Sequence, residues 1–241
     1  MIDAGTIDSL ATRLRTTTLN VAREYCQHLF LSSLYQQKAA DRMLFKGGTA
    51  LRIIYGSPRF SEDLDFSGFG LRSPAIEDLI AETLSGMEQV GLSLAIDEAK
   101  ITSGGYLGII RCRWMTYDLT VQLEVSLRPR RALAPSSALI AGDFLPAYTL
   151  LHLPEEALVA EKLQALLERG KPRDYYDLYF MLRKGLLPPG SRRALRPVLA
   201  KLARLRPEAL RELRLFLPID QQSLIKNFRA TLERELRKYL R

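Results

Sequence analysis

Hydrophobic and polar positions follow different periods along this chain, and the change of period divides it in two. Apolar side chains recur at helical spacing over residues 7–42, and residues 73–91 predict a second helix with Ser73 as N-cap and Pro74 at its first position. From Glu155 to the C-terminus every pattern is helical. Short apolar or alternating runs predict strands at 43–48, 62–69, 92–102, 107–116 and 120–127.

This order of elements predicts an α+β protein, with a small mixed sheet and flanking helices followed by an all-helical lobe. We expect the first domain to cover residues 1–150 and the helical lobe to cover 151–241. The sequence contains no apolar run long enough for a transmembrane helix and no secretory signal, so we expect no membrane association and a cytoplasmic location. Cys26 and Cys112 fit reduced, buried thiols, although the sequence leaves a single disulfide open.

A glycine turn stands in the segment FKGGTALRIIYGSPRFSEDLDFSGFG, residues 45–70. Gly47 and Gly48 have no side chains, so the main chain there can approach a phosphate closely. Thr49 is placed to cap a short helix over residues 49–55, whose free N–H groups would favour an anion. The alternative is a tight strand-to-helix turn that binds nothing.

Two carboxylates follow the glycine turn. Asp63 and Asp65 lie two apart on a predicted strand, so they leave the same face and repel each other unless a cation lies between them. Such hard oxygen ligands suit Mg²⁺, which often also holds substrate phosphates. Glu124, in VQLEVSL, is the best candidate for a third acid, with Asp118 and Glu98 as weaker rivals. Each acid could instead be an ordinary solvent-facing residue.

The residue composition argues against some kinds of catalytic chemistry and indicates the kind of partner. His28 and His152 have no zinc-ligand spacing, and no Gly-x-Ser-x-Gly elbow occurs, so zinc and serine-nucleophile chemistry are not expected. The net charge of +8 is uneven: residues 181–241 hold 16 Lys and Arg against 5 Asp and Glu, whereas the first 180 residues hold 19 against 22. A concentrated basic surface favours a nucleic-acid partner, and the alternative is a solvated helical face.

The order of Gly-Gly-Thr, Asp-x-Asp and a later lone acid resembles the nucleotidyltransferase fold of the DNA polymerase β type. The stretch EEALVAEKLQALLERGKPRDYYDLYFML, residues 155–182, is similar to the signature of the AbiEii family of nucleotidyltransferase toxins, which includes the MenT toxins. The resemblance covers roughly residues 40–185. It implies Mg²⁺-dependent transfer of a nucleoside monophosphate from an NTP to RNA, most plausibly the tRNA 3′ end, by a toxin that has a cognate antitoxin.

The resemblance also implies roles for single residues. Lys162 and one of two aspartates of the helical lobe would join the active site, with Lys162 neutralising triphosphate charge and Asp174 orienting it or helping to accept the proton. Arg52, Arg59 and Ser61 are further candidates for contact with the nucleotide. For the two arginines, surface ion pairing is the simpler explanation. The full expected sets are Asp63, Asp65, Glu124, Lys162 and Asp174 as catalytic residues, the first three as metal ligands, and Gly47, Gly48, Thr49, Arg52, Ser61, Lys162 and Asp177 around the nucleotide.

Two other functions stay open on the sequence. The same fold could transfer the nucleotide to a protein or a small-molecule hydroxyl, in which case the basic C-terminal region would not be needed. The chain could also be a non-catalytic module that binds nucleotide or RNA, although such a module gives no physical reason for a cluster of repelling acids.

Overall fold

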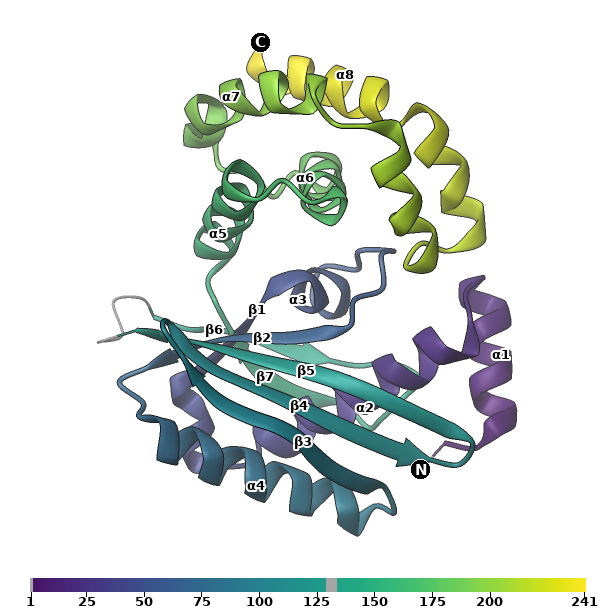
Figure 1. The fold of residues 1–241 in the computed structure, drawn as a ribbon, viewed down its shortest axis with the longest axis vertical. Helices are drawn as coiled ribbons and strands as arrows, with labels where there is room; N and C mark the ends of the chain where they lie inside the picture. The colour runs from purple at the N-terminus through teal and green to yellow at the C-terminus, as the bar shows by residue number, and fades with distance from the viewer. Residues whose placement is uncertain (1, 129–133) are drawn as a thin grey trace. The chain divides into compact units, whose positions relative to one another are not determined.

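The computed structural model describes residues 2–128 and 134–241, and contacts among these divide the chain into two compact units (Figure 1). The first, here called the sheet unit, comprises the residues up to Gly56 together with Phe60–Leu153. The second, the helical unit, comprises Pro154–Arg241 and the short segment Ser57–Arg59. A mixed sheet with packed helices in one unit and helices in the other confirm the α+β class.

Within the described residues the sheet unit has a seven-stranded sheet in the order β3-β4-β5-β2-β1-β7-β6. β2 runs parallel to β5 and β1 parallel to β7, whereas the other neighbours are antiparallel. Every predicted strand is present, and β6 and β7 are additional to the prediction. The bounds are β1 Met43–Lys46, β2 Asp63–Phe69, β3 Ser93–Thr102, β4 Gly105–Trp114, β5 Tyr117–Arg128, β6 Ser136–Ile140 and β7 Tyr148–His152.

The helix predicted over 7–42 is two α-helices and a short 3₁₀ turn, because the chain breaks at residues 15–17. Arg15 adopts a left-handed conformation with φ 51°, and Thr17 caps the next helix by accepting a hydrogen bond from the Asn20 amide. Ser73 is the first residue of its helix rather than the cap, which is Arg72. The elements are α1 Ala4–Leu14, α2 Thr18–Leu34, the 3₁₀ turn Lys38–Arg42, α3 Gly47–Ile53 and α4 Ser73–Gln89.

One face of the sheet forms the core. α2 contacts β5 and β7, α4 contacts β3 and β4, and the two helices pack against each other on this face (Figure 1). Leu64 and Phe66 of β2 are fully buried, as is Leu123 of β5, and the Phe30 ring of α2 lies 6.4 Å from that of Phe66. Because side chains alternate along a strand, the residues between these apolar positions project from the opposite face of β2 and β5.

The two cysteines come together in this core. Cys26 of α2 and Cys112 of β4 are free and buried, which confirms the expectation of buried thiols, and their Sγ atoms lie 3.1 Å apart. The hydrogen bond with Cys112 and burial raise the pKa of the Cys26 thiol well above its usual range, so Cys26 stays protonated at neutral pH.

The helical unit packs its own core. Tyr176 of α6 and Phe228 of α8 stack with ring centroids 6.1 Å apart, and Leu163 and Leu166 of α5 are buried. No helix among residues 2–128 and 134–241 is long and apolar enough to cross a membrane. The α-helices are α5 Glu155–Glu168, α6 Pro172–Lys184, α7 Arg192–Ala203 and α8 Phe228–Leu240, with 3₁₀ segments at Pro189–Ser191, Pro207–Leu215 and Ile219–Asn227.

Tyr35, which follows α2, ties two strands together. Its hydroxyl lies 2.7 Å from the Met43 carbonyl of β1 and 2.6 Å from the Leu151 carbonyl of β7. We predict that Tyr35→Phe lowers the free energy of unfolding by about 1–3 kcal/mol, because it leaves a buried carbonyl without its donor. Urea denaturation measures this change.

The matched control is Tyr117→Phe, since Tyr117 contacts Trp114 through its ring. It should change the free energy of unfolding by less than about 0.5 kcal/mol. Equal effects of the two substitutions would contradict the role given to the Tyr35 hydroxyl.

Candidate active site

The pairing of β2 with β5 brings the three predicted acids to one face of the sheet. Asp65 is the direct partner of Glu124, and Asp63 is the partner of Gln122, two residues before Glu124. Paired residues on neighbouring strands point to the same side. The face that carries these acids is opposite the face that α2 and α4 cover.

The glycine turn lies directly against one of these acids. Gly47 has φ 86°, and a Cβ at this position would overlap the carboxylate of Asp65, coming within 2.7 Å of its Cγ atom. Lys46, just before the turn, is the β1 partner of Asp65. Only a residue without a side chain allows this approach, so the bare main chain and the carboxylate that the sequence suggested are adjacent.

Thr49 does not cap its helix as predicted, and its contact with nucleotide stays a prediction. α3 begins at Gly47 with Lys46 as its N-cap, so Thr49 lies inside the first turn and does not cap the helix. Its side chain is 1% exposed, and its hydroxyl donates a hydrogen bond to the main-chain carbonyl of Asp63. Thr49 therefore fixes the start of β2 relative to the glycine turn.

The carboxylates share a face without forming an assembled metal site. Among residues 2–128 and 134–241, no group of three or more His, Cys, Asp and Glu side chains is arranged to hold a metal ion. Glu124 instead accepts a hydrogen bond of 2.6 Å from Gln122. The donor set itself, carboxylate oxygens beside exposed main chain, fits a hard divalent cation.

The two weaker candidates for the third acid form ion pairs of their own. Asp118 forms an exposed ion pair of 3.0 Å with Arg113, and Glu98 forms one with Lys100 of its own strand. β2 pairs with β5 only from Gln122 onward, so Asp118 lies outside the part of β5 that faces Asp63 and Asp65.

Arg52 and Ser61, predicted beside the nucleotide, make contacts within the sheet unit. The guanidinium of Arg52 donates to Glu24 at 2.6 and 2.8 Å and lies 3.4 Å from the centre of the Phe60 ring. The carbonyl of Ser61 accepts a hydrogen bond of 2.9 Å from Gln27. These contacts hold the stretch before β2 against α2, and a role for either residue in binding nucleotide stays a prediction.

The sequence analysis missed Lys46 as a member of this face. Its Nζ atom donates to the Ser126 hydroxyl at 3.2 Å, across β2, and Ser126 stands two residues after Glu124 on the same side of β5. Ser126 and Glu124 also line a pocket of 280 Å³ with the β3–β4 turn at Gly104 and Gly105. The position of a lysine immediately before the glycine turn was the signal that could have found it.

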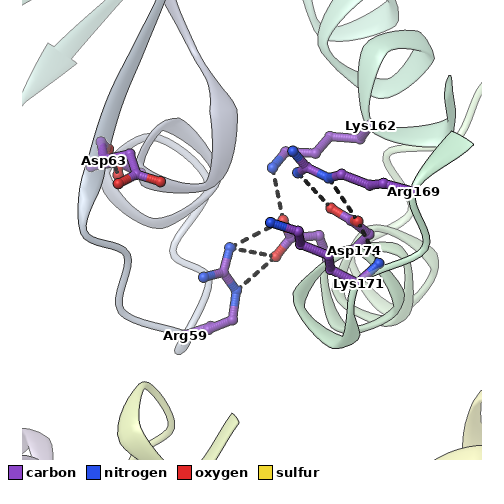
Figure 2. Close-up of polar contacts among 8 residues, drawn as sticks. Arg59, Asp63, Lys162, Arg169, Lys171 and Asp174 are labelled. Carbon is purple, nitrogen blue, oxygen red and sulfur yellow. Dashed lines mark hydrogen bonds and ion pairs between the residues drawn. The ribbon is translucent and has the colours of Figure 1, made fainter. Parts of the chain in front are cut away.

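In the helical unit, a buried carboxylate holds two cations. Asp177 of α6 is 1% exposed and accepts hydrogen bonds from Arg59 at 2.9 and 3.1 Å and from Lys162 of α5 at 2.8 Å (Figure 2). Burial raises the pKa of Asp177, but Arg59 and Lys162 lower it by more, so its net shift is downward. Asp177 therefore joins the segment Ser57–Arg59 to both helices.

A second ion pair joins the same two helices. Arg169, at the end of α5, donates to Asp174 at 2.8 and 3.0 Å, and the Lys171 amide donates to Asp174 at 2.9 Å (Figure 2). Asp174 is 2% exposed and satisfies main-chain N–H at the start of α6. Catalytic roles for Lys162 and Asp174, and contact of Asp177 with nucleotide, stay predictions.

The family comparison defines this chain as a nucleotidyltransferase. Its sequence matches the family model described as nucleotidyl transferase AbiEii toxin, type IV toxin–antitoxin system, over residues 29–240. The chain therefore belongs to the AbiEii family of nucleotidyltransferase toxins.

Solved structures share the fold. The crystal structure of JHP933 from Helicobacter pylori superposes with a TM-score of 0.69 at 20% identity, covering 93% of each chain. A second H. pylori structure, of a candidate nucleotidyltransferase, gives a TM-score of 0.68 at 20% identity, covering 92% of this chain and 94% of the other. No curated protein sequence matches the chain at a significant level.

Gly47→Ala tests the contact between the glycine turn and Asp65. We predict that it reduces nucleotidyl transfer at least about 100-fold, because the new Cβ displaces the carboxylate. Gly56→Ala is the matched control, since Gly56 also has positive φ, at 78°, but nothing lies near its Cβ position. Gly56→Ala should lower the free energy of unfolding by about 1–2 kcal/mol and leave the rate unchanged. Equal losses of activity would contradict this interpretation.

Asp177→Ala tests the buried ion pairs. Its removal leaves the buried Arg59 and the half-buried Lys162 without their carboxylate, so we predict a loss of about 3–5 kcal/mol in the free energy of unfolding at pH 7. The folded-state pKa of Asp177 is depressed, so this contribution is present above the unfolded value of 3.8 and is lost as the pH falls through the folded value. Urea denaturation at several pH values should show the variant and the wild type converging in acid.

Asp143→Ala provides the comparison, because Asp143 pairs with Arg13 where both side chains are 57% exposed. That substitution should cost less than about 1 kcal/mol. A similarly small cost for Asp177→Ala would show that the buried pairs do not stabilise the helical unit.

Proposed function

We propose that this nucleotidyltransferase transfers a nucleoside monophosphate from an NTP to a hydroxyl of RNA, at the 3′ end of tRNA, and that it does so with Mg²⁺. The observation that carries the proposal is the apposition of the Gly47 turn and Asp65, with Glu124 as the register partner of Asp65 on the next strand. A phosphate-binding turn and ionised oxygen ligands are the two parts that phosphoryl transfer requires.

The nucleotide binds through main chain in this proposal. α3 begins at Gly47, so its first N–H groups have no acceptor within the helix and can hydrogen-bond a phosphate oxygen. Gly47 and Gly48 offer no side chain that would block this approach. The cation of Lys46 lies on the same face and adds attraction for the phosphates.

The three acids would bind the metal and accept a proton. Asp63, Asp65 and Glu124 would hold the divalent metal, which when bound offsets the negative charge of the phosphates. Glu124 accepts the proton of the attacking hydroxyl, whose oxygen bonds to the α-phosphorus while the bond to pyrophosphate breaks. Glu124 is exposed and accepts a hydrogen bond from Gln122, so a substrate hydroxyl can take the place of that donor.

RNA as the acceptor is supported by the surface of the helical unit. The exposed cations of residues 181–241 outnumber the acids there, so a phosphate backbone would gain favourable contacts along several helices. They include Arg192, Arg193, Arg196, Arg204, Arg206, Arg211, Arg214, Lys226, Arg229, Arg234, Arg237, Lys238 and Arg241. As an AbiEii toxin, the protein would stop growth by blocking aminoacylation, and a cognate antitoxin would counteract it.

The experiment is transfer of labelled NMP to total tRNA with Mg²⁺. We predict that the wild type labels RNA, that chelating the divalent cation stops labelling, and that Asp65→Asn and Glu124→Gln each reduce the rate at least about 100-fold. Asp118→Asn, which removes an ion-paired acid from the same strand as Glu124, should retain the wild-type rate.

Three results would contradict parts of the proposal. Labelling of a protein or small molecule in preference to tRNA would replace the acceptor. Full activity of Asp65→Asn would remove the acid face from catalysis. Labelling of RNA that does not weaken as salt is raised would argue against the basic surface as the binding site.

A further inference from the structure

An open apolar groove lies within the helical unit. It has a volume of 530 Å³ and is lined on one side by α5, with Val159, Leu163 and Leu167, and on the other by residues 188–194, with Pro188 and Ala194. Its size and apolar lining are those of a surface that binds a ligand or a partner rather than of a packing gap. None of the residues predicted for catalysis or nucleotide binding lines it.

Both ends of the groove carry a carboxylate, and at one end Lys201 also donates to the main-chain carbonyls of Leu167 and Glu168. Glu156 and Glu168 line it at opposite ends of α5, and both are exposed. They are twelve residues apart, so their positions on the helix are separated by about 18 Å. Gln164 also lines the groove and donates to Glu168 at 2.8 Å, which keeps that carboxylate on the groove side of the helix.

This acidity is local. α5 carries four glutamates, Glu155, Glu156, Glu161 and Glu168, against a single lysine, whereas residues 181–241 hold 16 Lys and Arg against 5 Asp and Glu. A polyanion would be repelled by the carboxylates at the groove edges, and the floor between them is largely apolar. The charges and the floor therefore select a partner that is apolar along its length and cationic at its ends.

We propose that this groove docks an amphipathic helix of a partner protein, whose apolar side chains fill the floor and whose Lys or Arg residues pair with Glu156 and Glu168. Helix-in-groove recognition uses apolar side chains at positions i, i+3, i+4 and i+7 of the docked helix. The basic helices α7 and α8 of a second copy do not fit this description. Apolar residues of the basic helices α7 and α8, such as Leu195, Val198, Leu232 and Leu236, are already buried in their own unit.

The test uses two labelled peptides of about 15 residues, both with leucines at the helix-in-groove spacing, one with lysines and the other with glutamates at its ends. Fluorescence anisotropy with the full chain should show the lysine peptide binding at least about tenfold more tightly than the glutamate peptide. Glu156→Gln combined with Glu168→Gln should remove this preference, whereas Glu155→Gln, outside the groove, should preserve it.

A second variant tests the floor. Ala160 is exposed and lines the groove, so Ala160→Arg should fill it without disturbing the helix and should abolish binding of the lysine peptide. Circular dichroism establishes that each variant is folded. Equal binding of both peptides, or unchanged binding by Ala160→Arg, would overturn the proposal. Self-association of the wild type that Ala160→Arg abolishes would also overturn it, because a second copy would then be the occupant.

Discussion

The close approach of Gly47 to the carboxylate of Asp65 is the contact on which the candidate active site depends. It requires a residue without Cβ in a left-handed conformation at the start of α3, and it fixes the helix start against the middle of β2. Thr49 secures the same junction from the other side through the main chain of Asp63. The parallel pairing of β2 and β5 then determines which acid of β5 joins the face, since a shift of one residue would turn Glu124 toward the core.

The helical unit is organised by a different constraint, the cost of burying charge. Asp177 is almost wholly removed from water, and two cations compensate it. One of them, Arg59, belongs to a segment inserted in the sequence between α3 and β2, only four residues before Asp63. The buried pair therefore fixes the conformation of a short piece of chain that leads directly into the strand carrying two of the acids. Loss of either cation would leave the buried carboxylate of Asp177 less compensated, which is costly in a site removed from water.

Local patterns predicted the elements well and their partners poorly. Alternation along β2 and β5 indicated Asp63, Asp65 and Glu124 on polar faces, and the structure places them on one face. β6 and β7 were missed because they are five-residue strands with weak alternation between turn-rich stretches. Asp177 could not be recognised as a buried anchor, since its partner Arg59 lies 118 residues away in sequence and no local spacing reports such a contact. Contacts between residues far apart in the sequence, rather than local secondary-structure propensity, decided which elements and residues were missed.

The distribution of charge also separates surfaces within one small unit. The exposed arginines follow α7, α8 and the 3₁₀ segments between them, whereas α5 gathers glutamates beside an apolar floor. Screening confines the influence of exposed charges to about 8–10 Å at physiological salt, so surfaces of opposite sign can coexist on neighbouring helices. A phosphate backbone and a cationic helix would then be attracted to different parts of the same unit. A uniformly basic surface would suffice to bind RNA, so the glutamates of α5 need a separate physical explanation. The apolar groove between Glu156 and Glu168 supplies one.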